Sequence, residues 1–255
     1  AGLPELREII AEYVSKTRNI KVMPANVVVT PGAKPIMFFA VLALIEKGDE
    51  VIYPNPGFPI YESIIDFIGA KAVPIKLREE NQFRMDVGEL KKLVNKKTKL
   101  LFLNSPHNPT GSVLNYEDLK QISEIVLKHK RLFVLSDEIY GRVLYDGIAH
   151  SPASFPGMTE RTIILDGFSK AFAMTGWRVG YGAMPEKLAS AMTQLMINSN
   201  SCTASFSQRA ALEAMTGPQE EVEKMVAEFK RRRDVIVKEL NSIPKISCQM
   251  PNGAF

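Results

Sequence analysis

The chain has 255 residues, of which 45% are hydrophobic and 24% charged, and its formal net charge is +4. These values are ordinary for a globular protein that builds one large core, or one large domain with pieces of a second. No apolar run approaches the roughly 20 residues that cross a bilayer, and no signal peptide is visible.

Short apolar runs alternate with amphipathic helical runs, which predicts an α/β fold. Most strand-like runs are continuously apolar, as strands covered on both faces are. Asn115 is a good N-cap for one helix, since acidic residues occupy the first turn behind it. In chain order, the predicted elements are helix 4–16, strand 26–30, helix 34–46, strand 50–53, helix 59–68, strand 71–77, helix 87–94, strand 99–104, helix 116–129, strands 132–137, 162–167 and 178–183, and helices 186–198, 205–215 and 219–240.

We place one domain boundary near the polar stretch 198–203, after which the sequence becomes helical. It separates a large domain (1–200) from a second part (201–255) that holds interdomain helices and the beginning of a small α+β domain. A strand-like segment at 245–250 belongs to that second part. Neither Ala1 nor Phe255 looks like a natural terminus, so we expect a sequence trimmed at both ends.

The basic residues and cysteines give no sign of nucleic-acid or metal binding. The densest basic cluster, 230–233, lies in a helical run, where a solvated helix face is the simpler interpretation. The two cysteines and three histidines lack metal-ligand spacing. We therefore expect no metal, no nucleic-acid partner and no membrane partner, and a reducing, cytoplasmic location.

In an open α/β sheet, ligands bind beyond the carboxyl ends of the strands. The run from Thr30 through Gly32, Ala33 and Lys34 joins a strand to a helix at such an end. Glycine lets the backbone approach a ligand, and the helix N-terminus presents free N–H groups to an anion. A plain strand–helix turn is the alternative interpretation.

The loop 104–111 also follows a predicted buried strand and holds two X-Pro bonds and a glycine. A polar Asn108 on such a rigid loop suits hydrogen bonding to a ligand oxygen. We interpret His107 as a loop residue rather than a base, because nothing near it in the sequence forms a proton relay.

Asp137 ends a very apolar strand, where a carboxylate is costly unless it has a cationic or hydrogen-bonding partner. A protonated pyridine nitrogen would be such a partner. Tyr140 follows one turn later and can reach the same ligand, whereas Glu138 should point elsewhere and is interpreted as structural.

Lys170 lies just past another buried strand, with Ser169 beside it and Arg178 eight positions later. Burial lowers the pKa of a lysine amine and makes it nucleophilic, and an arginine can hold a phosphate. Schiff-base chemistry and a phosphate anchor are both required of an enzyme that uses pyridoxal 5′-phosphate (PLP).

These motifs occur together with the runs 1–7 and 48–51, in one characteristic order. Over essentially its whole length the chain resembles the class I/II aminotransferases of the aspartate aminotransferase type. The resemblance implies the PLP-dependent fold type I: a three-layer α/β/α large domain around a mostly parallel sheet of about seven strands, followed by the start of a small C-terminal α+β domain.

The resemblance also implies roles for individual residues. Lys170 would form the Schiff base and transfer the proton, Asp137 would pair with the pyridinium, and Asn108 and Tyr140 would contact the ring oxygen O3′. Phe58 falls where the family places an aromatic ring on the pyridine face, with core packing as the alternative. The phosphate would be held by the following residues: Gly32, Ala33, Lys34, Ser169 and Arg178.

Two departures from the family pattern stand out. Gly167 replaces a serine often found three positions before the lysine, which removes one phosphate hydroxyl. A family tyrosine that reaches the neighbouring subunit's phosphate would precede Ala1, and the arginine that binds the substrate carboxylate would follow Phe255.

The resemblance predicts a transaminase that exchanges an amino group between an L-amino acid and a 2-oxo acid, and a homodimer. Three alternatives stay open: a PLP-dependent lyase or cyclase of the same fold, a non-catalytic PLP-binding regulatory domain, and a folded part that is inactive alone. Aspartate, alanine and aromatic amino acids are all candidate substrates.

Overall fold

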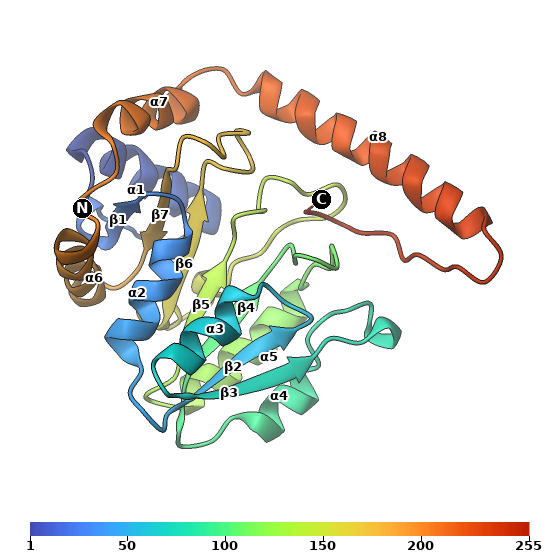
Figure 1. The fold of residues 1–255 in the computed structure, drawn as a ribbon, viewed down its shortest axis with the longest axis horizontal. Coiled ribbons are helices and arrows are strands. Elements are labelled where there is room, and N and C mark those ends of the chain that lie inside the picture. The colour runs from blue at the N-terminus through green and yellow to red at the C-terminus, as the bar shows by residue number, and fades with distance from the viewer. Residues whose placement is uncertain (255) are drawn as a thin grey trace.

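A computed structural model describes residues 1–254 and shows one seven-stranded sheet with helices on both faces (Figure 1). The α/β class is confirmed, and so is the mostly parallel sheet. The strands are β1 (Val27–Thr30), β2 (Glu50–Asn55), β3 (Lys71–Lys76), β4 (Thr98–Asn104), β5 (Phe133–Asp137), β6 (Thr162–Gly167) and β7 (Gly180–Ala183). The α-helices are α1 (Pro4–Arg18), α2 (Lys34–Leu44), α3 (Ile60–Phe67), α4 (Val87–Leu93), α5 (Tyr116–Lys128), α6 (Glu186–Ser199), α7 (Ser205–Thr216) and α8 (Glu220–Ser242).

Local sequence signals explain several of these boundaries. Asn115 caps α5 as predicted, since its side chain accepts a hydrogen bond from the backbone N–H of Asp118, whose own side chain accepts from the N–H of Asn115. Strand β7 begins later than predicted because Arg178 has a φ of 54°, which is incompatible with an extended strand.

The strand predicted at 245–250 is wrong, because these residues do not form a strand. Lys245 has a φ of 68°, and the backbone N–H and carbonyl of Cys248 both bond to the side chain of Asn241 instead of to a neighbouring strand. The chain pairs with the body only later, through an isolated bridge between Leu144 and Gly253.

The strand order is β1-β7-β6-β5-β4-β2-β3. Strand β7 is antiparallel to its two neighbours, β1 and β6, and all other neighbouring strands in the sheet are parallel. Because β7 is antiparallel to both β1 and β6, its first residue, Gly180, lies level with the last residues of those strands, Thr30 and Gly167. The loop between β6 and β7 therefore leaves and re-enters the sheet at the edge where the parallel strands end.

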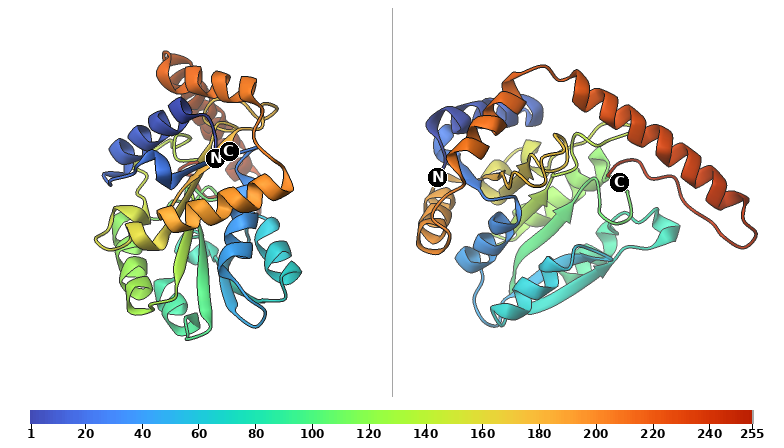
Figure 2. Two further views of the ribbon diagram at one scale, coloured as in Figure 1. Left: turned by 90° about the vertical axis from the view of Figure 1, so that its left-hand side faces the viewer. Right: turned by 45° about the horizontal axis from the view of Figure 1, so that its top comes forward.

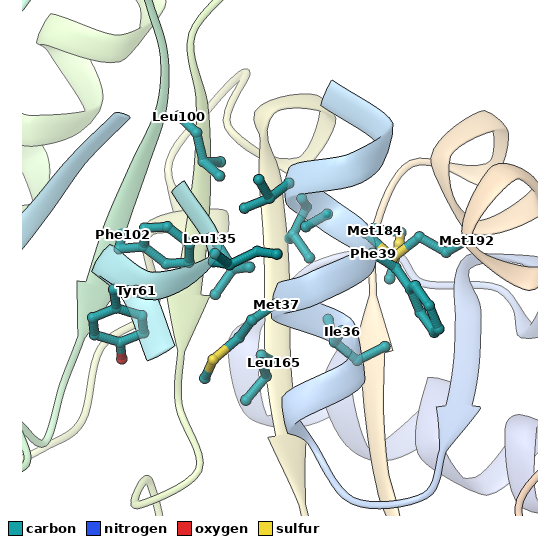
Figure 3. Packing of buried hydrophobic residues seen from close by; sticks show 14 of the residues in the cluster. Ile36, Met37, Phe39, Tyr61, Leu100, Phe102, Leu135, Leu165, Met184 and Met192 are labelled. Atoms are coloured by element: carbon teal, nitrogen blue, oxygen red, sulfur yellow. The ribbon is translucent and has the colours of Figure 1, made fainter. Parts of the chain in front are cut away.

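Helices α2, α3 and α6 cover one face of the sheet, and α1, α4, α5 and α7 cover the other (Figure 2). Between the first group and the sheet, α2 contributes Ile36, Met37 and Phe39 to a core that also holds Met192 of α6 (Figure 3). In the same cluster Tyr61 of α3 stacks on Phe102 of β4, with ring centroids 4.7 Å apart. Apolar strands buried on both faces thus produce the predicted three layers.

Helix α8 extends away from the sheet, and the segment after it returns to the body (Figures 1 and 2). Its buried Arg233 forms an ion pair with Asp146 at 2.6 Å and donates to the carbonyl of Pro251 at 2.8 Å. The boundary proposed near residue 200 stays a prediction, and Phe255, the last residue of its second part, lies outside the described residues.

Among the helices of residues 1–254, none combines the length and apolar character of a membrane span. Within the same range, no three histidine, cysteine or acidic side chains converge in a way that could hold a metal ion.

Candidate functional site

A cavity of about 220 Å³ opens at the carboxyl edge of the sheet. All but one of the site residues predicted from the sequence line it: Ala33, Lys34, Phe58, Asn108, Asp137, Tyr140, Ser169, Lys170 and Arg178. The remaining one, Gly32, lies directly behind the guanidinium of Arg178. The fold thus brings together residues that are spread over nearly 150 positions of the sequence.

Asp137 lies at the end of β5 with only 4% of its surface exposed. Burial raises the pKa of its carboxyl to about 7, and the nearby Asp166 and Glu138 carboxylates add to that rise. The hydroxyl of Tyr61 donates to it at 3.0 Å and the backbone N–H of Ile139 at 3.3 Å, and both bonds favour the charged form. A buried carboxyl of this kind is well suited to a cationic N–H partner.

Tyr140 and Asn108 form a hydrogen-bonded pair across the cavity, with the Asn108 side-chain amide donating to the Tyr140 hydroxyl at 3.1 Å. Burial raises the pKa of Tyr140 to about 12. The backbone N–H of Asn108 donates to the side-chain oxygen of Asn104 at 2.8 Å, and this bond anchors the loop that carries Asn108. Two polar groups therefore point together at one place on a ligand.

Lys170 follows β6 and projects into the same cavity, with Nζ 5.7 Å from the centroid of the Tyr140 ring. Burial lowers the pKa of its amine, partly offset by the negative charge of Asp137. The lowered pKa increases the fraction of neutral, nucleophilic amine at neutral pH.

An anion-binding corner forms where β1 enters α2. A Cβ on Gly32, whose φ is +84°, would lie 2.1 Å from Nη2 of Arg178, so only glycine lets this guanidinium pack against the backbone. Arg178 is also held by a 2.8 Å bond from Nη1 to the carbonyl of Thr175. With Ser169 and the N-terminus of α2, this corner offers a cation, a hydroxyl and free N–H groups.

Phe58 lines the cavity beside these groups, and the ammonium of Lys34 lies 5.0 Å from its ring centroid. The ring of Phe58 also forms a T-shaped contact with the ring of Tyr61, with the two centroids 6.1 Å apart. Phe58 is therefore available as an aromatic wall, and Lys34 occupies one of its faces.

Three other residues singled out in the sequence lie outside the cavity. Glu138 points to the opposite side of the sheet edge, as predicted. His107 is buried, its pKa is lowered to about 4 by that burial, and its Nδ1 bonds to Thr110 Oγ1 at 2.8 Å, which fits a neutral loop residue. Gly167 leaves no room for a side chain, since a Cβ would meet the Cα of Gly180 at 2.9 Å.

Sequence reasoning missed Tyr61, Asn104 and Thr175. Tyr61 looked like a core position of a helix, and its contact with Asp137 joins residues 76 positions apart. Asn104 did carry a usable signal, because it ends a continuously buried strand in the same way as Asp137. Its side-chain amide donates to the Asp137 carbonyl at 3.0 Å and so ties the two strand ends together.

The residues present fit PLP. The buried Asp137 carboxyl suits a protonated pyridine nitrogen, the Asn108–Tyr140 pair suits a phenolic oxygen, and the corner at Arg178 suits a phosphate. The amine of Lys170 enters the cavity between these groups, where an aldehyde would be attacked.

Comparisons with known proteins agree with this interpretation. The family described as "Aminotransferase class I and II" matches residues 1–255. An aspartate aminotransferase of Pyrococcus abyssi is 43% identical over the whole chain. Among solved structures, an aromatic aminotransferase from Pyrococcus horikoshii is 41% identical with a TM-score of 0.96, and an alanine aminotransferase from Pyrococcus furiosus is 33% identical with a TM-score of 0.94.

The matches cover 100% of this chain but only part of each relative. The chain spans 66% of the P. abyssi protein and 69% and 65% of the two structures. It corresponds to about two thirds of these proteins.

Proposed function

Because the chain belongs to the class I and II aminotransferases, we propose that it carries the cofactor site of an enzyme that moves an amino group between an L-amino acid and a 2-oxo acid. One observation supports this most directly. Lys170, Asp137, the Asn108–Tyr140 pair and Arg178 line a single cavity at the carboxyl edge of the sheet.

PLP is the cofactor of this family. When bound, PLP supplies an electron sink for the charge that develops at the substrate α-carbon. The protein's contribution is to hold the ring in a fixed orientation and to set the protonation states around it.

The residues of the cavity divide this work. Arg178, Ser169 and the start of α2 hold the phosphate, and Asp137 accepts the hydrogen bond of the protonated ring nitrogen. Asn108 and Tyr140 orient the ring oxygen, while Phe58 forms a wall beside it.

Lys170 is the proton carrier in this proposal. Its amine would hold the cofactor's aldehyde group, and Nζ projects into the cavity where the substrate α-carbon would lie. The lowered pKa of Lys170 lets it accept a proton there and return it at the adjacent carbon.

The substrate class rests on the names of the relatives, which differ in the amino acid they mention: aspartate, aromatic amino acids and alanine. Aspartate as the amino donor, with a set of 2-oxo acids as acceptors, is the first combination to test, since aspartate recurs among the relatives' names.

We further propose a homodimer, a cytoplasmic location and a division near residue 200. Large exposed hydrophobic side chains on three helices (Phe67, Ile197 and Phe206) support a subunit contact. The two cysteines are both free thiols, which agrees with a reducing compartment. Sedimentation as a monomer at working concentration would contradict the dimer.

The function is tested by mixing the protein with PLP, recording the visible spectrum, reducing with borohydride and mapping the modified peptide. We expect label on Lys170, and Lys170→Ala should lower amino transfer by about 10²–10⁴-fold. Lys187→Ala, an exposed lysine on α6, is the matched control and should keep the label and the activity.

Label spread over surface lysines would contradict the cofactor site. Label on Lys170 with ammonia released from the amino acid, and no dependence on an acceptor 2-oxo acid, would contradict amino transfer and indicate an elimination reaction.

A further inference from the structure

The loop that carries Lys170 separates two cavities. Asp137, Leu165 and Lys170 line the cofactor cavity, whereas Glu138 and Asp166 line a larger one of about 450 Å³. Neighbouring residues of the same strand ends thus face opposite sides, as the alternation of side chains along a strand requires. A contact that holds Glu138 and Asp166 at the larger cavity therefore also holds the ends of β5 and β6, which present Asp137 and Leu165 to the cofactor cavity.

The group that fixes them is Arg18, the last residue of α1. Its Nε donates to Glu138 at 2.9 Å and its Nη2 donates to Asp166 at 2.9 Å. The three side chains expose only 9%, 7% and 10% of their surfaces. A guanidinium that bridges two buried carboxylates is a strong, directional contact, and removing it leaves two like charges close together without compensation.

Both carboxylates are held on their other oxygens as well. Glu138 Oε1 accepts from the hydroxyls of Ser136 and Ser151 at 2.9 and 2.6 Å. Asp166 Oδ1 accepts from the backbone N–H of Gly167 at 2.7 Å, and Oδ2 also accepts from the Tyr181 hydroxyl at 3.1 Å. The network is therefore satisfied only with Arg18 in place, and it reaches the backbone at Gly167, the last residue of β6 before the turn to Lys170.

We propose that Arg18 is a positioning residue of the cofactor site: by holding Glu138 and Asp166 together from the far side, it sets the spacing of the β5 and β6 ends that present Asp137 and Lys170. The backbone supports this coupling, because the N–H of Glu138 donates to the carbonyl of Leu165 at 2.8 Å. Arg18 itself does not line the cofactor cavity. The inference rests on the proposed function.

Arg18→Met removes the ion pairs with both Glu138 and Asp166. Arg18→Lys keeps the positive charge but lacks the planar guanidinium that bridges the two carboxylates. Arg209→Met is the matched control, since it breaks an exposed ion pair between α7 and Glu5 of α1. Glu138→Gln removes one carboxylate of the network and keeps its shape.

The first measurement uses the protein without PLP. Amide hydrogen exchange over residues 165–172 should become at least about tenfold faster in Arg18→Met than in the parent, because the turn loses its far-side support. The exchange rate of this peptide should lie between those of the parent and Arg18→Met in Arg18→Lys, and it should equal the parent rate in Arg209→Met.

The second measurement uses the PLP-loaded protein. We expect kcat to fall by about ten- to a hundredfold in Arg18→Met, with a much smaller change in KM, because reacting groups are misplaced and not removed.

The midpoint of a pH titration of the cofactor's visible absorption should move to higher pH in Arg18→Met, which loses a positive charge. It should move to lower pH in Glu138→Gln, which loses a negative charge. The charged or titratable groups that line the cofactor cavity are Lys34, Asp137, Tyr140, Lys170 and Arg178, and the buried Tyr61 donates to Asp137.

Borohydride labelling of Lys170 in the parent separates the two proposals. Absence of that label overturns the proposed function. Label on Lys170 together with parent-like exchange, kcat and titration midpoint in Arg18→Met overturns the positioning role. If Arg18→Met does not fold, Arg18→Lys and Glu138→Gln provide the comparison. Parent-like exchange and kcat in both variants, or a midpoint in Glu138→Gln that does not move to lower pH, would then overturn the positioning role.

Discussion

Asp137 is the residue in which the conflict between folding and function is clearest. Its carboxyl lies in the interior at the end of an apolar strand, with Tyr61 and a backbone N–H as its hydrogen-bond donors. These neutral donors offset only part of the cost of burying a charge, so the carboxyl holds its proton up to about pH 7. A cationic ligand would supply the charged hydrogen-bond donor that stabilises the ionised carboxylate.

The stability of the ligand-free protein should therefore carry a pH signature from Asp137. Its pKa rises from 3.8 to about 7 on folding, so between these values the folded state binds more protons than the unfolded state. The free energy of unfolding should then fall as pH rises through this window, by at most about 1.4 kcal/mol per pH unit from this one group. Asp137→Asn removes the contribution.

Urea unfolding of the parent and of Asp137→Asn at pH 5, 6, 7 and 8, without PLP, measures this effect. The variant's stability relative to the parent should increase with pH. Asp66→Asn, at an exposed position on α3, controls for the loss of one negative charge. Parallel curves for the parent and Asp137→Asn would show that the carboxyl does not titrate in this window.

At the scale of elements, the junction of β1 and α2 shows how a turn becomes a binding corner. Gly32 and Gly180 allow β1, β7 and the start of α2 to approach closely, since a Cβ on Gly180 would meet the backbone N of Ala33 at 2.4 Å. The same closeness lets Arg178 lie flat against the turn. Backbone geometry and anion binding therefore depend on the same two glycines.

We expect Gly32→Ala to lower PLP affinity by at least about tenfold, because its methyl group would occupy the place of the Arg178 guanidinium and displace a charge-assisted contact. Gly48→Ala is the matched control. It has a similar φ of +91° but nothing within 4 Å of the added Cβ, so it carries the backbone strain without the clash. Equilibrium titration with PLP gives the affinities, and equal losses in the two variants would assign the effect to strain.

Most elements could be predicted because their signals are local. Strand 162–167 has the predicted bounds, and the N-cap at Asn115 is confirmed by its hydrogen bond. The predicted strand 245–250 failed because a local apolar pattern does not reveal whether a partner strand is present. Roles that depend on packing were equally invisible: Arg18 reaches Glu138 and Asp166 across 120 and 148 residues of sequence.

At the scale of the whole molecule, α8 is attached to the body at few points. Arg233 is one of its three buried residues, with Val222 and Val237, whereas Arg231 and Arg232 pair with Glu228 within the helix. Arg233 also lies over the ring of Tyr145, 4.9 Å from its centroid, and so joins α8 to the segment after β5 and to the returning C-terminal segment.

Arg233→Met should loosen α8 without unfolding the sheet. We expect limited proteolysis within α8 and residues 243–250 to become several-fold faster, because local opening no longer breaks the contacts of the buried Arg233 guanidinium with Asp146 and the Pro251 carbonyl. Arg231→Met, which removes only an exposed intrahelical pair, should behave like the parent. Loss of the sheet's cooperative unfolding in Arg233→Met would show instead that α8 is integral to the core.

The place of β1 at the sheet edge has a consequence for the protein's synthesis. Among the described strands β1 pairs only with β7, which leaves the ribosome about 150 residues later, or roughly 8–30 s at ordinary elongation rates. During that interval the apolar run Val27–Val29 has no sheet to join and is a target for chaperones or for wrong pairing. The same strand delivers Gly32 to Arg178, so the phosphate corner is assembled only when the last strand of the sheet is in place. Cofactor binding through this corner therefore requires synthesis of the chain through β7.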